Sequence, residues 1–284
     1  MRIFGLDVTS RPRARKPITC AVCDLDSGEL RLETVESLTS FESLEEFLQR
    51  PGPWVAGLDF PFGQPRKLVE DLGWPLDWEG YVERVSRMTR QEFALTLRTY
   101  WTGRPIGEKF HFRSADKIAR ACSPMMLDFT PVGKMFYELA PRLMRSGGCV
   151  IPCRPNASDR VAVEAYPGVL ARHWIDRLSY KSESRKKQTS ERLSAREELL
   201  ARVESPEFGA YYGFKCSCRA LKQMLVQDAT GDTLDAFLCA VQAAWAHTHR
   251  HKDYGMPENC DALEGCIADP QCFSPNCCLN RPNP

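Results

Sequence analysis

The sequence has almost no net charge and no long hydrophobic run. Its 38 lysine and arginine residues stand against 37 aspartate and glutamate residues, which leaves a formal charge of +1. Proteins that coat nucleic acid or anionic membranes by bulk attraction carry a large positive excess, so any contact with a polyanion must come from local patches. No stretch approaches the roughly 18 continuous apolar residues of a membrane span. We therefore expect no membrane partner.

The sequence also lacks the features of a secretory leader. Residues 1–8 enter a strand-like run without a charged segment followed by an apolar one, so we expect a cytoplasmic protein. The 13 cysteines are an odd number in a chain too long to need disulfides, and reduced thiols are expected. The cysteines of the last 25 residues do not have the spacing of the usual zinc knuckles, so we do not expect a structural zinc: Cys260, Cys266, Cys272, Cys277 and Cys278.

The composition is that of a globular protein, with 43% hydrophobic and 26% charged residues. The pattern predicts strands over 2–8, 18–25, 29–35 and 54–60, with a helix over 41–49 that Thr39 and Glu42 would cap. A helical crossover normally returns the chain parallel in the same sheet. The fourth strand is therefore expected to lie parallel to one of the first three.

After residue 60, the sequence pattern predicts more helices than strands. We expect a helical insertion over about 61–148, a strand over 161–166, a helix starting at Pro167, and helices over 183–203 and 232–248. The fold class is α/β: a mixed sheet of three strands, a crossover helix and further strands, flanked by helices. No linker divides residues 1–270, which we expect to form one domain, followed by a Cys- and Pro-rich tail over 271–284.

Two acidic residues occur in the same local context. Gly5-Leu6-Asp7 and Gly57-Leu58-Asp59 carry the same tripeptide in the same strand phase. Because alternate strand residues share a face, neighbouring parallel strands would juxtapose Asp7 and Asp59. The alternative is that each Asp ends its strand and caps the following turn.

Three further acids are candidates for the same place. Glu164 lies in the strand over 161–166; it could instead pair with an arginine, for which Arg160 and Arg172 are candidates. Asp232 and Asp235 begin the long helix and would form one stripe with Asp228 if the helix extends back that far. Helix capping is the alternative for Asp232 and Asp235.

Carboxylates that converge need a counter-charge. Two like charges about 4 Å apart repel by about 4 kcal/mol at an effective dielectric constant near 20, and a divalent cation is the simplest remedy. Oxygen ligands without His or Cys favour Mg²⁺ or Mn²⁺, and two such ions support in-line attack of water on a phosphodiester. We expect a metal-dependent nuclease or phosphodiesterase in which Asp7, Asp59, Glu164 and Asp235 bind the metal and Asp232 assists.

Basic residues near these acids are candidates for binding nucleic acid. Arg113, Asp116 and Arg120 share one face of a short helix, where the alternative is a salt-bridged surface helix. Arg11 and Arg13 follow Asp7 directly and would stand beside a site there. Lys181 belongs to a second basic run, for which an exposed helix end is the simpler explanation.

Taken together, these segments resemble the domain of unknown function 429 family, described as predicted nucleases with an RNase H-like fold. The resemblance spans roughly residues 3–270 and is carried by Gly5-Leu6-Asp7, by residues 58–63 and 113–120, by Glu164-Ala165-Tyr166-Pro167 and by residues 232–236. It implies an RNase H-like fold in which Asp7, Asp59, Glu164 and either Asp232 or Asp235 bind the metal. The chain departs from the family pattern at Cys266, where that pattern has Trp.

Two other functions are open at this point. The segment 5–10 is compatible with the phosphate loop of an actin-like or sugar-kinase-like ATPase, but such enzymes need a second lobe with its own glycine-rich turn. Gly147-Gly148 is the candidate for that turn. In a non-catalytic binding module, the carboxylates would serve only as caps and ion pairs.

Overall fold

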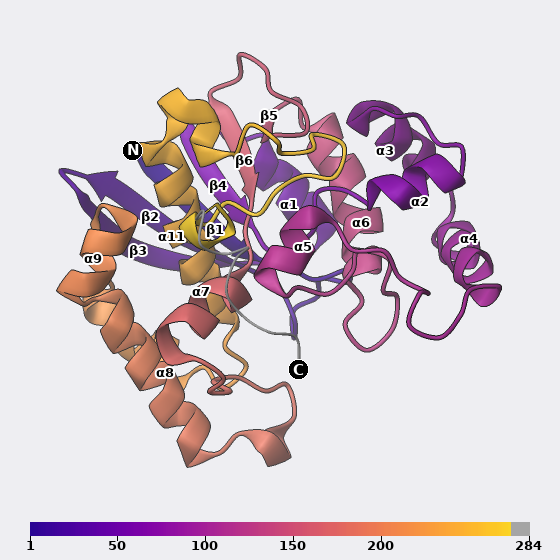
Figure 1. The fold of residues 1–284 in the computed structure, drawn as a ribbon. Helices are drawn as coiled ribbons and strands as arrows, with labels where there is room; N and C mark the ends of the chain where they lie inside the picture. The colour runs from indigo at the N-terminus through magenta and orange to yellow at the C-terminus, as the bar shows by residue number, and fades with distance from the viewer. Residues whose placement is uncertain (274–284) are drawn as a thin grey trace.

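A seven-stranded mixed sheet forms the centre of the molecule, in the order β5-β6-β4-β1-β2-β3-β7 (Figure 1). The computed structural model describes residues 1–273. β1 pairs antiparallel with β2 and parallel with β4, and β4 pairs parallel with β6. The strands are β1 (Arg2–Asp7), β2 (Ile18–Asp26), β3 (Glu29–Leu38), β4 (Trp54–Leu58), β5 (Cys149–Ile151), β6 (Arg160–Glu164) and β7 (Lys215–Ser217). The predicted mixed α/β sheet is confirmed, and the fourth strand, expected parallel to one of the first three, is parallel to the first.

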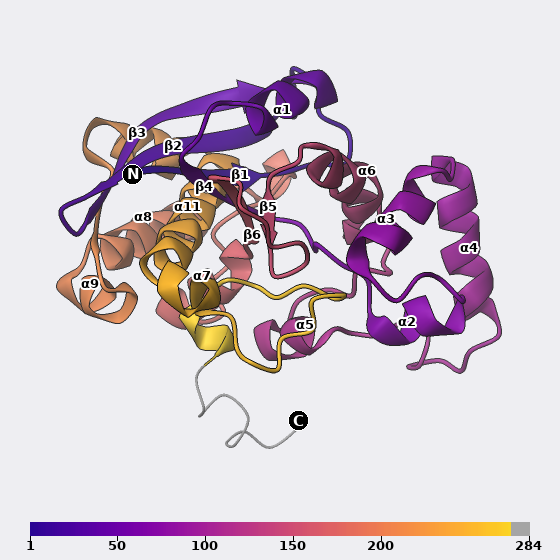
Figure 2. The same cartoon turned by 90° about the horizontal axis from the view of Figure 1, so that it is seen from above.

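Helices cover both faces of this sheet (Figure 2). One core lies between the sheet and α7, α8, α9 and α11, and a second core lies between the opposite face and α1, α3, α4 and α6. The helices are α1 (Phe41–Leu48), α2 (Arg66–Asp71), α3 (Trp78–Ser86), α4 (Arg90–Thr102), α5 (Ser114–Ala119), α6 (Val132–Arg145), α7 (Pro167–Ile175), α8 (Ser190–Val203), α9 (Pro206–Tyr212), α10 (Lys222–Gln227) and α11 (Asp232–Thr248). α2 to α6 lie between β4 and β5, where the sequence predicts a helical insertion.

The first four strands, α1 and α11 match their predicted ranges within a few residues. The predicted cap of α1 is wrong: Ser40 is its N-cap and forms a reciprocal capping box with Ser43. α8 begins at Ser190 rather than at 183, because a short 3-10 turn at Arg185–Lys187 interrupts the charged segment. The sequence did not predict β5, β7, α9 or α10.

The cysteines near the end of the chain depart from the expectation of reduced thiols. Cys260 and Cys266 form a disulfide, so neither offers a thiolate to a metal. Cys277 and Cys278, with most of the expected tail, lie outside the described residues. In the described part of the chain, no helix has both the length and the apolar character required to cross a membrane.

Two glycines set the distance between the sheet and α11. A β-carbon on Gly5 would lie 2.0 Å from the carbonyl oxygen of Ala236, and one on Gly57 would lie 2.3 Å from that of Cys239. Contacts this short are not possible between non-bonded atoms, so only glycine lets α11 rest directly on β1 and β4. The Gly-Leu-Asp repeat therefore brings the N-terminal turn of α11 over the ends of both strands.

Candidate active site

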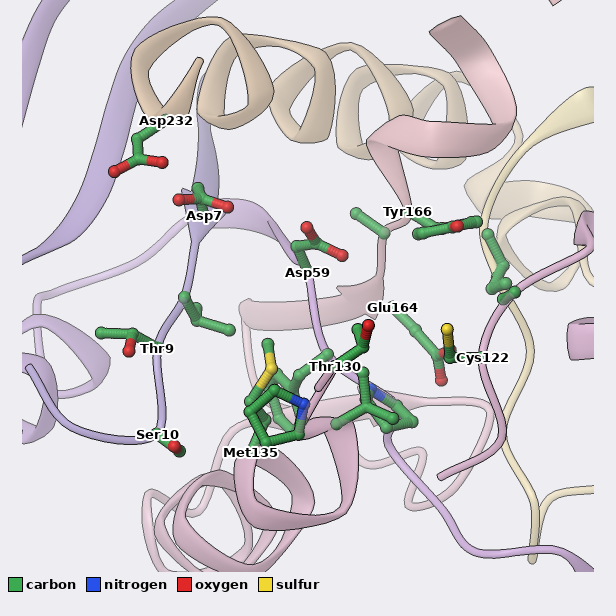
Figure 3. Close-up of a pocket in the computed structure, with 18 of the residues that line it drawn as sticks. Asp7, Thr9, Ser10, Asp59, Cys122, Thr130, Met135, Glu164, Tyr166 and Asp232 are labelled. Carbon is green, nitrogen blue, oxygen red and sulfur yellow. The ribbon is translucent and has the colours of Figure 1, made fainter. Parts of the chain in front are cut away.

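Asp7 and Asp59 lie side by side at the carboxyl ends of β1 and β4. The parallel register pairs Gly5 with Gly57 and Leu6 with Leu58, and the Asp59 backbone N–H donates a 3.0 Å hydrogen bond to the Leu6 carbonyl. Both carboxylates are half-buried and face a common cavity (Figure 3). The predicted juxtaposition of the two aspartates is confirmed.

The first turn of α11 brings two more acids to this point. Asp235 is fully buried, and Asp232 lies above Asp7 at the edge of the cavity (Figure 3). Asp228 does not continue the stripe, because α11 begins at Asp232 and Asp228 instead accepts hydrogen bonds from Thr230 and Thr233. Asp7, Asp59, Asp232 and Asp235 thus form one group of acids, which we call the acidic cluster.

Lysine ammonium groups supply positive charge to the acidic cluster. Lys181 binds Asp235, whose other oxygen accepts a 2.6 Å hydrogen bond from the Tyr180 hydroxyl. The Lys181 side chain is 44% exposed, and a β-carbon on Gly231 would lie 2.7 Å from its Cβ. Lys16 binds both oxygens of Asp232, at 3.0 and 2.9 Å, and also binds Glu183. These lysines therefore supply part of the counter-charge that the sequence analysis expects from a divalent cation.

The pKa values reflect the crowding of these charges. Burial, and then the neighbouring carboxylates of Asp235, Asp59 and Asp232, raise the pKa of Asp7 well above its usual range, although Lys181 opposes the shift. Burial raises the pKa of Asp59 to about 7 against the influence of Lys181, and Asp235 adds to the rise. Burial lowers the pKa of Lys181, but Asp235, Tyr180, Asp7 and Asp59 together outweigh burial and raise this pKa well above its usual range. The cluster is thus short of positive charge even with the lysine in place.

Glu164 lines the same cavity as Asp7 and Asp59 (Figure 3), and its part in metal binding stays a prediction, but its carboxylate is held by an arginine. Glu164 pairs in register with Leu58, so its side chain shares the face of Leu58 rather than that of Asp59. The guanidinium of Arg113 binds both of its oxygens, at 2.8 and 2.6 Å, and the Phe62 backbone N–H donates a further bond of 2.8 Å. The alternative that Glu164 pairs with an arginine is confirmed, but the arginine is Arg113 and not Arg160 or Arg172.

Arg113 and Asp116 are bound to other protein groups at the wall of the cavity. Each is 1% exposed, and the Arg113 Nη2 lies 2.7 Å from Asp116 Oδ1. Arg113 also donates a 2.9 Å bond to the Glu264 carbonyl, so its donors are directed at protein groups. Both residues also line the cavity, so their contact with a substrate stays a prediction. The sequence could not show the pairing of Arg113, because its nearest partner outside its own helix lies 51 residues away.

The remaining predicted binding residues stand around the mouth of the cavity. Arg11 and Arg13 are exposed in the loop after Ser10, and Arg120 is exposed at the end of α5 in the left-handed conformation, with φ of 48°. Ser10 and Cys122 lie on opposite sides of the cavity (Figure 3), so the two basic segments next to them flank it. Their positions are compatible with contacts to phosphates.

The cavity has a volume of about 600 Å³. Asp7, Asp59 and Asp232 lie on one side, while Thr130 and, near the start of α6, Met135 lie on the opposite side (Figure 3). Its lining includes Asp7, Thr9, Ser10, Asp59, Cys122, Thr130, Met135, Tyr166 and Asp232. Such a volume falls within the range of about 300–1,000 Å³ that is typical of small-ligand sites.

The acids match the oxygen donors that Mg²⁺ and Mn²⁺ prefer, but they are not arranged as a finished metal site. Within residues 1–273, no three His, Cys, Asp or Glu side chains are placed to hold a metal ion together. The ammonium of Lys181 lies against Asp235 instead and acts electrostatically on both Asp7 and Asp59. A metal would therefore compete with this lysine.

The sequence reasoning missed two residues of the site. Tyr180 carried no signal, because its buried bond to Asp235 joins residues 55 positions apart. Lys16 is part of the basic loop after Asp7, but only the fold brings it to Asp232. Gly147-Gly148 precedes β5 and thus lies at the amino ends of the parallel strands, opposite to Asp7. This position counts against a phosphate turn that acts together with the segment 5–10.

Comparison with known proteins identifies one family. The family model described as "Protein of unknown function (DUF429)" matches residues 5–259, which include the whole acidic cluster. No curated protein and no solved structure matched the chain.

Proposed function

We propose that this chain, which belongs to the DUF429 family, is a metal-dependent phosphodiesterase that acts on nucleic acid. The observation that carries the proposal is the juxtaposition of Asp7 and Asp59 at the ends of two adjacent parallel strands, with Asp235 and Asp232 on α11 next to them. Asp7 and Asp59 face a cavity that is large enough for a substrate. A purely structural role would leave unexplained why these carboxylates face a cavity at such an electrostatic cost.

Asp7, Asp59 and Asp235 are the proposed ligands of Mg²⁺ or Mn²⁺. When bound, a divalent cation supplies Lewis-acid stabilisation of charge on the phosphate oxygens and activates water. Lys181 would leave Asp235 as the metal enters, and its exposed stem allows that movement without disturbing the core. The freed ammonium can then bind a phosphate oxygen, the role that the sequence suggests for Lys181.

Asp232 and Glu164 have supporting parts in this proposal. Asp232 holds Lys16 at the edge of the cavity, while Glu164 and Arg113 fix the start of α5 against β6. We also propose a cytoplasmic location: Cys260 and Cys266 form a disulfide, but Cys20, Cys23 and Cys239 in the core are free thiols, which are typical of a reducing compartment. Cell fractionation tests this location.

The test compares the native protein with Asp7→Asn and Asp59→Asn on labelled single-stranded, duplex and branched nucleic acids with Mg²⁺ or Mn²⁺. Asp26→Asn is the matched control, since Asp26 is exposed at the far end of β2. We expect metal-dependent cleavage that falls by about 100-fold or more in the two site variants and is unchanged in the control. Cleavage that survives both site substitutions would indicate a contaminant. If Mn²⁺ does not change the melting temperature of the native protein, the protein has no metal site.

A further inference from the structure

The cavity over the acidic cluster is walled, and its walls limit what can reach the acids. Its volume of about 600 Å³ suits a ligand of the size of one nucleotide. Duplex DNA is stiff, with a persistence length of about 150 base pairs, and cannot bend into a space of that size. A single strand is flexible enough to enter it.

The charges of the cavity also argue against a duplex. Proteins that grip duplex DNA neutralise several phosphates at once with free Lys and Arg side chains. The basic side chains that line this cavity, Lys16, Arg113 and Lys181, are each bound to carboxylates. The exposed Arg11 follows Ser10, and the exposed Arg120 lies two residues before Cys122; Ser10 and Cys122 line opposite sides of the cavity (Figure 3). That arrangement fits a single backbone passing across the opening.

An exposed aromatic ring stands next to this opening. Phe129 is fully exposed and immediately precedes Thr130, which lines the cavity. Its φ of 62° is rare for a bulky residue. Asp128, which precedes Phe129, binds Arg98 and Lys134, each at 3.3 Å, so the segment that carries the ring is anchored on both sides. Exposed aromatic rings beside basic residues are the usual platforms for unpaired bases.

We propose that the substrate is a single-stranded nucleic acid that places one nucleotide in the cavity and stacks a neighbouring base on Phe129. This inference rests on the proposed function for the cleavage step, whereas the binding step can be measured separately. The shared chemistry of DNA and RNA strands is a flexible polyanion with exposed base faces. The contacts named above do not involve the sugar, so both kinds of strand are included in the test.

The experiment measures binding of labelled oligothymidylate, oligouridylate and a blunt DNA duplex by fluorescence anisotropy with EDTA and with Ca²⁺. We expect single strands to bind about tenfold or more tightly than the duplex. Phe129→Ala should raise the Kd for single strands by about 5- to 150-fold, and Phe129→Trp should keep the native Kd. Leu95→Ala, at an exposed apolar position on α4, is the matched control and should change nothing.

Two results would overturn the inference: equal affinity for single strands and duplex, or an unchanged Kd in Phe129→Ala. Hydrolysis of bis(para-nitrophenyl) phosphate with Mn²⁺ tests the proposed function alone, because this small diester needs neither a strand nor Phe129. If it is hydrolysed while strand and duplex bind alike, only the substrate inference fails. If it is not hydrolysed while Phe129→Ala weakens strand binding, the proposed hydrolysis fails and the strand-binding site stands.

Discussion

Lys181 binds the buried carboxylate of Asp235 at the place where the sequence predicts a metal ion. The lysine reaches this acid from outside the core, since its stem is 44% exposed while Asp235 is buried. Its ammonium also acts electrostatically on Asp7 and Asp59. One ammonium thus acts on three acids, from the ends of two strands and from a helix, and this arrangement gives the metal a competitor within the chain.

Removal of this competitor should strengthen metal binding. In Lys181→Met the acids keep their positions but lose the ammonium, and we expect Mn²⁺ to bind about 10- to 100-fold more tightly in isothermal titration calorimetry at neutral pH. Lys67→Met is the control, because Lys67 pairs with Asp71 on the exposed surface of α2. Unchanged or weaker binding in Lys181→Met would mean that the cation does not take the lysine's place.

Glu164 and Arg113 should behave as a structural pair. Glu164→Gln removes one charge from a pair whose side chains are 3% and 2% exposed, and breaking such a pair costs about 3–5 kcal/mol of unfolding free energy. Urea unfolding measures this loss, while the Mn²⁺-induced rise in melting temperature should remain. The control Glu83→Gln, in an exposed pair with Arg87, should cost less than about 1 kcal/mol. If Glu164→Gln is stable but Mn²⁺ no longer raises its melting temperature, Glu164 is a metal ligand.

The close packing of α11 on the sheet predicts the effect of a single methyl group. Gly5→Ala would place a β-carbon 2.0 Å from the Ala236 carbonyl oxygen and 2.2 Å from the Ala240 nitrogen. Both are backbone atoms of a buried helix, so we expect a loss of about 3 kcal/mol or more and a displaced acidic cluster. Gly103→Ala is the control, since that position has open space and an ordinary φ. Equal stability of the two variants would contradict the packing described here.

The sequence predicted what depends on local pattern. Alternation in the first four strands and the repeated Gly-Leu-Asp placed Asp7 beside Asp59 correctly. In a parallel pair, residues at matching positions of the two strands have their side chains on the same face of the sheet. The boundaries of α11 followed from its apolar pattern and acidic first turn. These features need only neighbours in the sequence.

What the sequence missed depends on contacts between distant segments. Glu164 lies one residue out of phase with Asp59, and only the fold shows that an arginine holds its carboxylate at the edge of the shared cavity. Arg113 binds Glu164, which lies 51 positions away in the sequence, and Lys16 binds Asp232, which lies 216 positions away. No spacing rule reaches so far, so charges that seemed available to a substrate turned out to be bound within the protein.

The raised pKa of Asp59 predicts how the stability of the metal-free protein depends on pH. The folded protein keeps the proton up to about pH 7, whereas the group releases it near 3.8, its ordinary value, in the unfolded chain. Between pH 3.8 and about pH 7 the folded state binds more protons than the unfolded state. The free energy of unfolding that this group contributes therefore falls as the pH rises, and the whole loss is reached above about pH 7. Other acids titrate in the same range, so the informative quantity is the difference between the native protein and Asp59→Asn.

In Asp59→Asn the side chain is neutral at every pH. We expect the melting temperature of the native protein, relative to this variant, to fall by several degrees between about pH 4 and pH 7 in EDTA. Mn²⁺ requires the ionised carboxylate, so its stabilisation of the native protein should grow over the same interval, while Asp59→Asn should respond weakly throughout. The measurement is differential scanning fluorimetry across this pH range with and without Mn²⁺. A flat difference curve would mean that Asp59 is ionised in the folded state and that solvent or Lys181 already compensates its charge.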